Sequence, residues 1–269
     1  MRIARFTTGD EPLFGIVTGD LDEYGQPDPD AQIVALAGDP IYAGINPLDQ
    51  THRLADVRLL APVIPRSKVV AIGKNYADHV VEMGGATGEL PPEPLMFLKP
   101  NTSVIGPGDP IFYPRQTQNL HYEGELAVVI GRICRDVPPE QATDVIYGYT
   151  IGNDVTARDL QKSDGQWSRA KGFDTFCPLG PWIETEGAFE DALIETRVDG
   201  ELRQSGRTSE MVHSVAELIA FASRVWTLLP GDVILTGTPA GVGPFTDGQV
   251  VEVSIEGIGT LSNPARARA

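Results

Sequence analysis

Short apolar segments bounded by glycine, proline or polar residues dominate the chain after residue 95. Their lengths are those of ordinary β-strands, and they do not alternate with helical segments. This pattern argues against a doubly wound sheet or a TIM barrel, in which strands and helices alternate. It predicts a mainly β fold with some α-helix, of the α+β class. The segments are LMFLK (95–99), TSVIG (102–106), ELAVVIG (125–131), VIYGYTIG (145–152), PWIET (181–185), IETRV (194–198), DVILTG (232–237) and QVVEVSI (249–255).

One helix and one hairpin have clear local signals. The segment 213–232 carries apolar residues at helical spacing, and Ser214 and Glu217 form a capping box near its start. The Pro230-Gly231 pair marks its end. Asp199-Gly200 separates two strand-like runs and suits the type I′ turn of a two-residue hairpin.

The first 62 residues differ from the rest of the chain in their strand-like segments and connectors. Strand-like segments at 1–7, 13–19 and 31–37 are separated by polar connectors rich in glycine and proline. The sequence therefore predicts a small N-terminal domain at residues 1–62. A larger domain follows at residues 63–269, and all the candidate site residues fall in it.

The composition excludes several classes of partner. The chain has a formal net charge of −16 and a sequence pI of about 4.6. It would repel phosphate backbones and anionic lipids, so we expect neither a nucleic-acid nor a membrane partner. Cys134 and Cys177 form no CxxC pair and no disulfide framework, which is typical of the cytoplasm. No signal peptide and no membrane-spanning apolar run is visible, so we expect a cytoplasmic protein.

Two glutamates stand at the start of the apolar segment within HYEGELAVVIG (121–131). Residues two apart on a strand point to the same face, roughly 6–7 Å apart along the chain, so Glu123 and Glu125 would lie together. Asp154 follows another apolar strand and would bring a third carboxylate to the same sheet edge. For the glutamate pair alone, the alternative is an exposed edge strand, where charge opposes aggregation.

Three carboxylates in close quarters repel one another, and each raises the pKa of the others. A divalent cation removes that cost, and all-oxygen ligation favours Mg²⁺, Mn²⁺ or Ca²⁺ over Zn²⁺ or copper. Three protein ligands would leave positions on an octahedral ion for water or substrate. We therefore predict a metal site at Glu123, Glu125 and Asp154, with Mg²⁺ or Mn²⁺ as cofactor and Ca²⁺ as an ion that crystals could carry.

Six motifs, in this order along the chain, resemble the fumarylacetoacetate hydrolase family. The resemblance covers roughly residues 57 to 265. It implies the family's β-roll of mixed strands with a few helices, here with a small N-terminal domain, and a homodimer. The motifs are GKNYADHVVEMG (73–84), FLKP (97–100), HYEGELAVVIG (121–131), GYTIGNDVTARDLQ (148–161), RAKGFDTFCPLGPW (169–182) and GDVILTGTPAGVG (231–243).

The resemblance also implies a chemistry. Enzymes of this family act on 2-oxo and 2,4-dioxo acids through a metal-stabilised enolate, and their metal ligands fall on Glu123, Glu125 and Asp154 here. A 2-oxo acid can chelate the ion through a carboxylate oxygen and the keto oxygen. The ion then stabilises the negative charge that develops on the keto oxygen. We therefore expect a small anionic 2-oxo acid as the substrate.

His79 and Glu82 lie three residues apart on a predicted helix and so share one face. By resemblance they are catalytic, and in hydrolytic members the matching pair activates a water. An imidazole suits proton transfer near neutral pH, and the carboxylate can orient it. Without the resemblance, a surface histidine on a helix would be the simpler interpretation. The loop at 84–94, rich in glycine and proline, is a candidate lid.

The resemblance extends the site to five further residues. Lys171 is the catalytic candidate among them, and the other four would bind substrate. Arg158 and Gln161 follow Asp154 by four and seven residues, so a helical turn would keep them near the metal. Structural hydrogen bonds and surface charge are the alternative roles. His121 would share the face of Glu123, either as a partner of a metal ligand or as a neighbour packed against the sheet, and we do not expect it to bind the metal. The five residues are Arg158, Gln161, Lys171, Thr238 and Lys99.

Three functions fit these residues. The first is metal-dependent cleavage of a C–C bond, as in oxaloacetate decarboxylases and acylpyruvate hydrolases, and the chain length and motifs favour it. The second is isomerisation of 2-hydroxyhepta-2,4-diene-1,7-dioate in aromatic catabolism, which also runs through a dienolate. The third is a non-enzymatic Ca²⁺-binding β domain, which would explain the carboxylates but not His79, Arg158 and Lys171.

Overall fold

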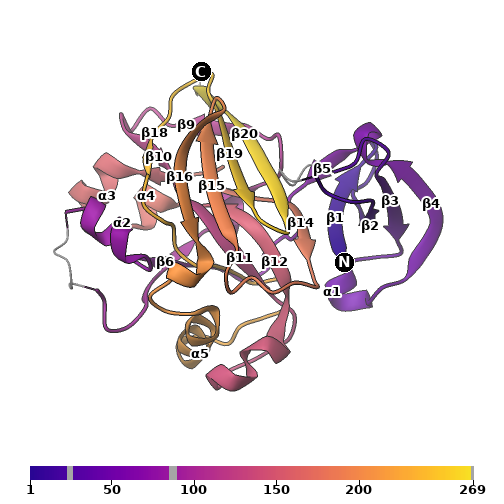
Figure 1. Ribbon diagram of the computed structural model, residues 1–269, viewed down its shortest axis with the longest axis horizontal. Helices are drawn as coiled ribbons and strands as arrows, with labels where there is room; N and C mark the ends of the chain where they lie inside the picture. The colour runs from indigo at the N-terminus through magenta and orange to yellow at the C-terminus, as the bar shows by residue number, and fades with distance from the viewer. Residues whose placement is uncertain (23–26, 85–89, 268–269) are drawn as a thin grey trace.

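The computed structural model describes residues 1–22, 27–84 and 90–267. Within these ranges the chain is mostly β-sheet with a few short helices, as predicted (Figure 1). The described strands form sheets of twelve, five and three strands. No helix in these ranges is both long and apolar enough to cross a membrane. The central part of the predicted lid, residues 85–89, lies outside the described residues.

The N-terminal residues form a lobe at one side of the molecule (Figure 1). Strand β1 pairs antiparallel with β2 and β5 inside the lobe, and also with β14 (Cys177–Glu184) of the main body. One sheet therefore runs through both parts, and the domain boundary after residue 62 stays a prediction. The lobe contains β1 (Arg2–Thr7), β2 (Leu13–Thr18), β3 (Gln32–Leu36), α1 (Pro40–Ala43), β4 (Pro47–Arg53), the 3-10 helix η1 (Leu54–Asp56) and β5 (Arg58–Leu60).

The main body continues this sheet in the order β14, β12, β11, β17, β6 and β7, with β8 beside β14. Neighbours along this order are antiparallel except β17 and β6, which are parallel. Every residue of β11 is buried, as the apolar run from Leu126 to Ile130 predicts. The strands are β6 (Val69–Gly73), β7 (Leu95–Lys99), β8 (Val104–Ile105), β11 (Gly124–Ile130), β12 (Ile146–Asn153) and β17 (Val233–Leu235).

A five-stranded sheet and helix α5 (Val215–Val225) cover the same face of β11 at its two ends. Near the first end, Leu126 clusters with Ile194 and Val253 of the five-stranded sheet. Near the other end, Val128 and Ile130 pack in a cluster that includes residues of α5. The sheet order is β16 (Glu201–Arg207), β15 (Leu193–Val198), β19 (Val250–Ile255), β20 (Gly259–Ala267) and β9 (Ile111–Tyr113).

The predicted local signals are present, but α5 is shorter than expected. Ser214 Oγ accepts a hydrogen bond from the Glu217 amide, and Glu217 returns one to the Ser214 amide, so the capping box is confirmed. The helix ends at Val225, before the Pro230-Gly231 signal, because the following chain turns extended and pairs with another segment. The hairpin at Asp199-Gly200 is also confirmed, since both residues have positive φ, as a type I′ turn requires.

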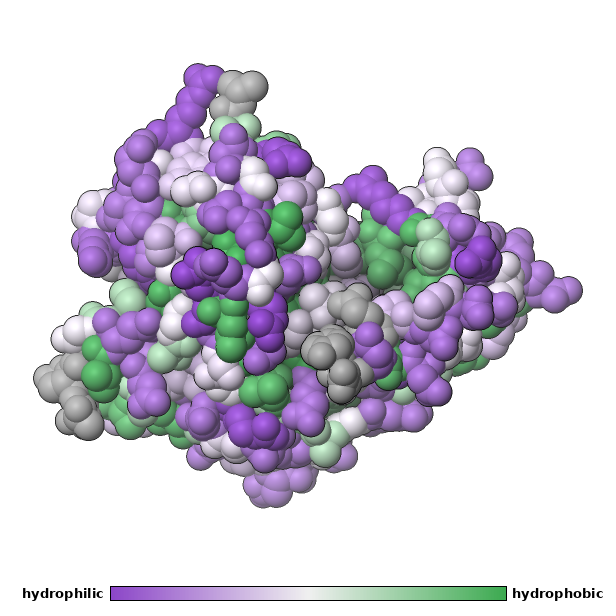
Figure 2. Space-filling model, turned by 45° about the horizontal axis from the view of Figure 1, so that its top comes forward, coloured by the Kyte–Doolittle hydropathy of each residue, from purple (hydrophilic) through white to green (hydrophobic). Residues whose placement is uncertain are grey.

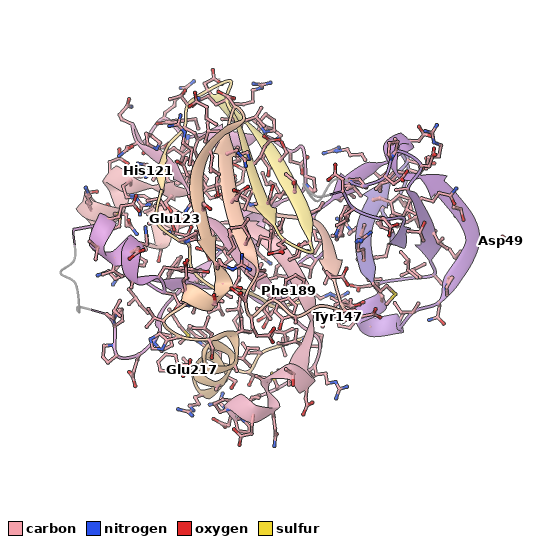
Figure 3. The ribbon with its side chains drawn as sticks, in the orientation of Figure 1. Asp49, His121, Glu123, Tyr147, Phe189 and Glu217 are labelled. Carbon is pink, nitrogen blue, oxygen red and sulfur yellow. The ribbon has the colours of Figure 1, made fainter. Side chains whose placement is uncertain are left out.

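The remaining elements gather on the side of the body away from the N-terminal lobe. Three short helices lie there, beside a three-stranded sheet (Figure 1). Glu123 lies on this side, whereas Asp49 of β4 marks the far edge of the lobe (Figure 3). These elements are α2 (Ala77–Glu82), α3 (Arg158–Asp164), α4 (Ser168–Lys171), β10 (Leu120–Tyr122), β13 (Thr156–Ala157) and β18 (Gly243–Pro244), with the 3-10 helices η2 (Asn101–Ser103), η3 (Pro139–Val145) and η4 (Thr208–Glu210) elsewhere.

Candidate active site

The three predicted carboxylates meet where β10, β11 and β12 join. Glu123 lies between β10 and β11, Glu125 lies in β11, and Asp154 follows β12. Because β11 and β12 pair with Gly124 opposite Asn153, both strands deliver their acidic residues to one place. One oxygen from each carboxylate lies within 4.8 Å of the others, and all three residues are buried.

The glycine between the two glutamates is required by close packing. A Cβ on Gly124 would lie 2.4 Å from the Thr196 hydroxyl and 2.8 Å from a methyl group of Val253. The five-stranded sheet therefore approaches the backbone at this point, and it closes the site from one side.

Basic side chains surround the carboxylates. The Lys171 ammonium donates to Glu123 Oε2 at 2.8 Å and to Asp154 Oδ2 at 2.5 Å, so it bridges the two residues. Arg158 donates from Nη2 to Glu123 Oε1. Lys99 donates to Asp154 Oδ1 at 2.5 Å and to the Lys171 carbonyl oxygen. Three buried cations thus bond to two of the three buried carboxylates, Glu123 and Asp154.

Glu125 differs from the other two acids, because no basic side chain of the described residues bonds to it. Its Oε2 accepts a hydrogen bond from the Gly237 amide at 2.7 Å. Burial, followed by repulsion from Asp154 and Glu123, raises the pKa of Glu125 well above its ordinary value. Burial acts in the same direction on Glu123, but Lys171 and Arg158 outweigh it and hold the pKa of Glu123 below its usual range.

Lys171 stays charged for the complementary reason. Burial alone would lower the pKa of its ammonium, but the Asp154 and Glu123 carboxylates outweigh burial and raise the pKa. The ammonium already supplies positive charge between two of the carboxylates. The three carboxylates together also suit a hard divalent cation, because all three donors are carboxylate oxygens. The residues present therefore fit a Mg²⁺ or Mn²⁺ site.

Helix α2 brings His79 and Glu82 to the same site. His79 Nδ1 lies 3.2 Å from Glu82 Oε2, as the three-residue spacing predicted. The Gly241 amide donates to both oxygens of Glu82, at 3.0 and 3.2 Å. The loop that follows β17 therefore fixes the carboxylate, and the carboxylate in turn orients the imidazole. His79 is buried, so it is not the surface histidine of the alternative interpretation.

A cavity of about 240 Å³ connects these groups. It brings together all the predicted site residues except Glu82, Lys99 and Asp154, which contact residues of its wall. Lys99 is completely buried behind Asp154, so it contacts a carboxylate and does not line the cavity. The lining residues are Ile72, Gly73, Lys74, His79, Met83, Glu123, Glu125, Arg158, Gln161, Lys162, Trp167, Lys171 and Thr238.

The route from Asp154 to Arg158 is not the helical turn that we expected. Residues 156–157 instead form β13, which pairs with β10, and helix α3 begins only at Arg158. Gln161 still lies beside Arg158, whose Nη1 donates to Gln161 Oε1 at 2.7 Å. Strand pairing, not helix periodicity, brings these residues to the carboxylates.

Thr238 and His121 lie beside the carboxylates. Thr238 Oγ1 donates to the Gly124 carbonyl and accepts from Gln204, so it ties the β17 loop to the Glu-Gly-Glu turn. His121 contacts Asn119 through Nε2, and it makes no hydrogen bond to a carboxylate of the site among the described residues. Burial, followed by the positive charge of Arg158, lowers the pKa of His121 to about 4. His121 therefore lies beside the site, and its role there stays a prediction.

The sequence analysis missed six of the thirteen residues of the cavity wall: Ile72, Gly73, Lys74, Met83, Lys162 and Trp167. Each lies inside or next to a quoted motif, but a lysine or a tryptophan in a loop or a short helix has no pattern that places it in a cavity. Proximity to His79 and Arg158 along the chain was the one available signal.

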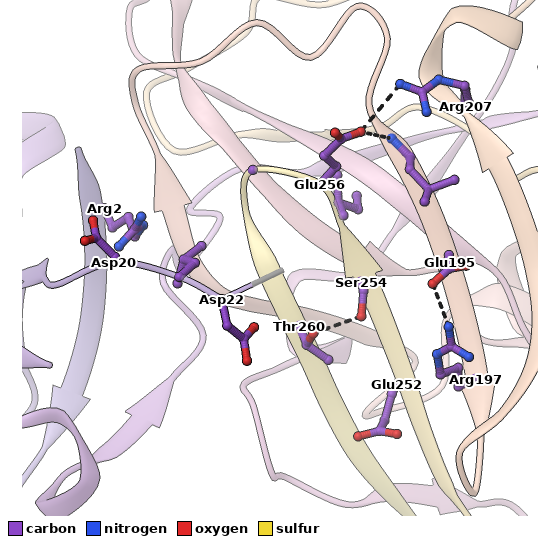
Figure 4. Close-up of a pocket in the computed structure, with 14 residues that line it drawn as sticks. Arg2, Asp20, Asp22, Glu195, Arg197, Arg207, Glu252, Ser254, Glu256 and Thr260 are labelled. Carbon is purple, nitrogen blue, oxygen red and sulfur yellow. Dashed lines mark hydrogen bonds and ion pairs between the residues drawn. The ribbon is translucent and has the colours of Figure 1, made fainter. Parts of the chain in front are cut away.

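A larger hollow of about 830 Å³ lies between the N-terminal lobe and the five-stranded sheet (Figure 2). Its charged residues form ion pairs that are exposed or half-exposed. Arg197 pairs with Glu195 at 2.7 Å and Arg207 with Glu256 at 3.5 Å (Figure 4). No group of three potential metal ligands lies here among the described residues, which distinguishes it from the smaller cavity.

Comparison with known proteins shows the family of the chain. A family profile described as the fumarylacetoacetate (FAA) hydrolase C-terminal domain matches residues 68–266, and one described as Rv2993c-like, N-terminal, matches residues 1–62. Protein Rv2993c of Mycobacterium tuberculosis is 53% identical over 98% of this chain and 97% of its own length. Oxaloacetate tautomerase YisK of Bacillus subtilis is 45% identical over 78% of this chain and 69% of its own length.

Solved structures extend the likeness to the whole chain. The 5-carboxymethyl-2-hydroxymuconate delta-isomerase of Mycobacterium smegmatis is 50% identical, with full coverage of both chains and a TM-score of 0.90. A maleylpyruvate hydrolase of Sphingobium, in complex with manganese(II) and pyruvate, is 31% identical, also with full coverage, and has a TM-score of 0.79. The chain belongs to the fumarylacetoacetate hydrolase family. It is therefore an enzyme, and the non-enzymatic calcium-binding alternative is set aside.

Proposed function

We propose that this enzyme of the fumarylacetoacetate hydrolase family holds one Mg²⁺ or Mn²⁺ ion at Glu123, Glu125 and Asp154 and acts on a small anionic 2-oxo acid. The observation that carries the proposal is the meeting of three buried carboxylates, whose oxygens lie within 4.8 Å of one another and of which Glu125 has no basic partner among the described residues. A divalent ion would add two positive charges there. Buried charge requires a partner, so a small anion in the cavity would offset them.

The residues of the chain have distinct parts in this proposal. When bound, the ion would supply a Lewis acid for negative charge on the keto oxygen of the substrate. Arg158 and Lys171 line the cavity and would hold the neighbouring carboxylate group. His79 would move a proton to or from the carbon next to the keto group, and Glu82 would keep its imidazole oriented.

Among the reactions that such a site can perform, we favour proton transfer without bond cleavage, that is, tautomerisation or isomerisation of the 2-oxo acid. It needs only an acid–base group and stabilisation of an oxyanion, and the described residues can supply both. Relatives named oxaloacetate tautomerase and 5-carboxymethyl-2-hydroxymuconate delta-isomerase support this choice. The ranking differs from that of the sequence analysis, which put C–C cleavage first.

Cleavage of a C–C bond is the second candidate. The contact between His79 and Glu82 favours it, because such a pair can also take a proton from an attacking water. The neighbour named maleylpyruvate hydrolase supports it as well. Decarboxylation needs no such water, so the effect of a His79 substitution separates the two forms of cleavage.

The test of the proposal follows hydrogen exchange and turnover separately. Purified enzyme with Mg²⁺ in D₂O should exchange the C3 protons of pyruvate, observed by NMR, faster than Mg²⁺ alone does. A panel of oxaloacetate, acetylpyruvate, fumarylpyruvate and 2-hydroxyhepta-2,4-diene-1,7-dioate, assayed with Mg²⁺ and with Mn²⁺, then separates isomerisation from cleavage. Absence of both exchange and turnover across the panel would refute the proposal. The homodimer stays a prediction, which light scattering can check.

A further inference from the structure

We propose that Lys74 and Lys162 bind the distal carboxylate of a dicarboxylic substrate and so determine a preference for dicarboxylic over monocarboxylic 2-oxo acids. The inference rests on the proposed function and deepens it. It concerns the mouth of the cavity, whereas the groups discussed so far lie on its floor.

Positive charge is concentrated at this cavity in a chain that is strongly acidic. Four of its thirteen lining residues are Lys or Arg, against 21 in all 269 residues. Arg158 and Lys171 are paired with carboxylates of the floor. Lys74 and Lys162 are exposed, and neither has an ion-pair partner among the residues that the structure describes. Their charges are thus available to a ligand.

Helix α3 connects the floor with the mouth. Arg158 and Lys162 are four residues apart on it, so they share one face and are separated by about 6 Å along the axis. Arg158 is buried against Glu123, and Lys162 is exposed. The step from a buried to an exposed cation therefore matches the length of a few carbon–carbon bonds. A small diacid would have its first carboxylate near Arg158 and its second near Lys162.

Lys74 has an unusual backbone conformation. Its φ is +59°, in the left-handed region that favours glycine over lysine. The next residue fixes this conformation, because the Asn75 side chain donates to the carbonyls of His213 and Thr236 and accepts from the His213 amide. Such strain tends to occur where it serves a site, and here it turns the chain between β6 and α2 at the cavity wall.

The wall beside Lys74 is aromatic. A Cβ on Gly73 would lie 2.6 Å from the Trp167 ring, so the ring packs directly on the backbone before Lys74. No acidic residue lines the cavity among the described residues apart from Glu123 and Glu125, so nothing on the wall competes for the two lysines.

The test compares two ligands of equal chain length in calorimetric titrations of the Mg²⁺-loaded protein. They are 2-oxoglutarate, which has a distal carboxylate, and 2-oxopentanoate, which has none. An exposed ammonium contributes up to about fivefold in affinity, so we expect the wild type to prefer 2-oxoglutarate by about tenfold. Lys74→Gly and Lys162→Met should each remove a few-fold of that preference, and should leave 2-oxopentanoate binding unchanged.

Lys74→Gly also separates function from folding, because glycine fits the left-handed conformation and should not destabilise the protein. Arg132→Gln is the matched control. Arg132 is exposed and follows the far end of β11, roughly 20 Å along the strand from Glu125, and its substitution removes the same charge. It should leave the preference for 2-oxoglutarate unchanged.

The outcomes separate this inference from the proposed function. Equal affinity of the wild type for the two ligands would overturn the inference alone. An equal loss of preference in the Arg132 variant would also overturn it, since long-range charge would then account for the effect. If neither ligand binds the Mg²⁺-loaded wild type, the proposed function fails and the inference fails with it.

Discussion

The two cavities differ in how they hold charge. The larger one, about 830 Å³, is lined by ion pairs at or near the surface, such as Arg197 with Glu195. The floor of the smaller one, about 240 Å³, contains carboxylates and cations that are almost completely buried. Surface pairs contribute little to stability, whereas buried charges are costly unless fully partnered. Burial of charge, more than volume, identifies the functional cavity.

The strongest test of this comparison removes a carboxylate from the smaller cavity. Asp154→Asn or Glu123→Gln should lower Mn²⁺ affinity and reduce turnover at least about a hundredfold, because each removes a charged oxygen ligand. Calorimetry with Mn²⁺ and steady-state kinetics measure the two effects. Full activity of either variant in a metal-free preparation would contradict the assignment.

Removal of the acid–base group should have the next largest effect. His79→Ala should lower kcat by about a hundredfold or more if His79 transfers the proton, while Mn²⁺ affinity stays close to that of the wild type. Glu82→Gln, which keeps the size of the side chain, should lower kcat less, because the imidazole remains in place. A variant without His79 that retained wild-type kcat would show that another group transfers the proton.

The pH dependence of metal binding gives a smaller effect with a defined sign. Glu125 has a raised pKa, so the folded metal-free protein holds a proton that the unfolded chain releases above the ordinary value of 4.5. Considering Glu125 alone, the folding stability of the metal-free protein therefore falls as pH rises from about 4.5 to the raised pKa of Glu125. A bound ion displaces the proton, so Mn²⁺ affinity should rise up to about tenfold per pH unit while Glu125 is protonated.

Titrations with Mn²⁺ between about pH 5 and 8 measure this linkage. Glu125→Gln is the control, since a variant without the titrating carboxyl should lose this part of the dependence. A pH dependence identical in the wild type and the variant would mean that another group binds the proton.

Substitution in the larger cavity should have the smallest effect. Arg197→Ala breaks a partly exposed pair with Glu195 and should change the free energy of unfolding by about 0.5 kcal/mol. Turnover and metal affinity should not change. Denaturant unfolding and kinetics on the same sample would check both, and a large loss of turnover would remove the distinction between the two cavities.

Local patterns in the sequence were sufficient for much of the fold. The capping box at Ser214 and the hairpin at Asp199-Gly200 depend on neighbouring residues, and both are present. The end of α5 depends on distant residues, because the chain after Val225 pairs with the segment around Cys134. The pairing of β1 with β14 joins residues about 180 positions apart and has no local signal.

The site divides in the same way. The three carboxylates could be predicted because strand alternation and two apolar segments direct them to one edge. Lys99 was predicted to bind substrate, but it is buried behind Asp154, and only the packed structure distinguishes a cation of the floor from one of the mouth. Lys74 and Lys162 were missed for the same reason, since the exposure of a lysine carries no periodic signal.

The pairing of β1 with β14 covers an edge of the main sheet. Arg2 and Ile3 cover the backbone of Glu184 and Ile183, at the end of β14 that β8 does not reach. A chain shortened by its first 62 residues would present those backbone groups, and the apolar side chains around them, to other molecules. Loss of the lobe would therefore leave this part of β14 open to strand addition from another molecule.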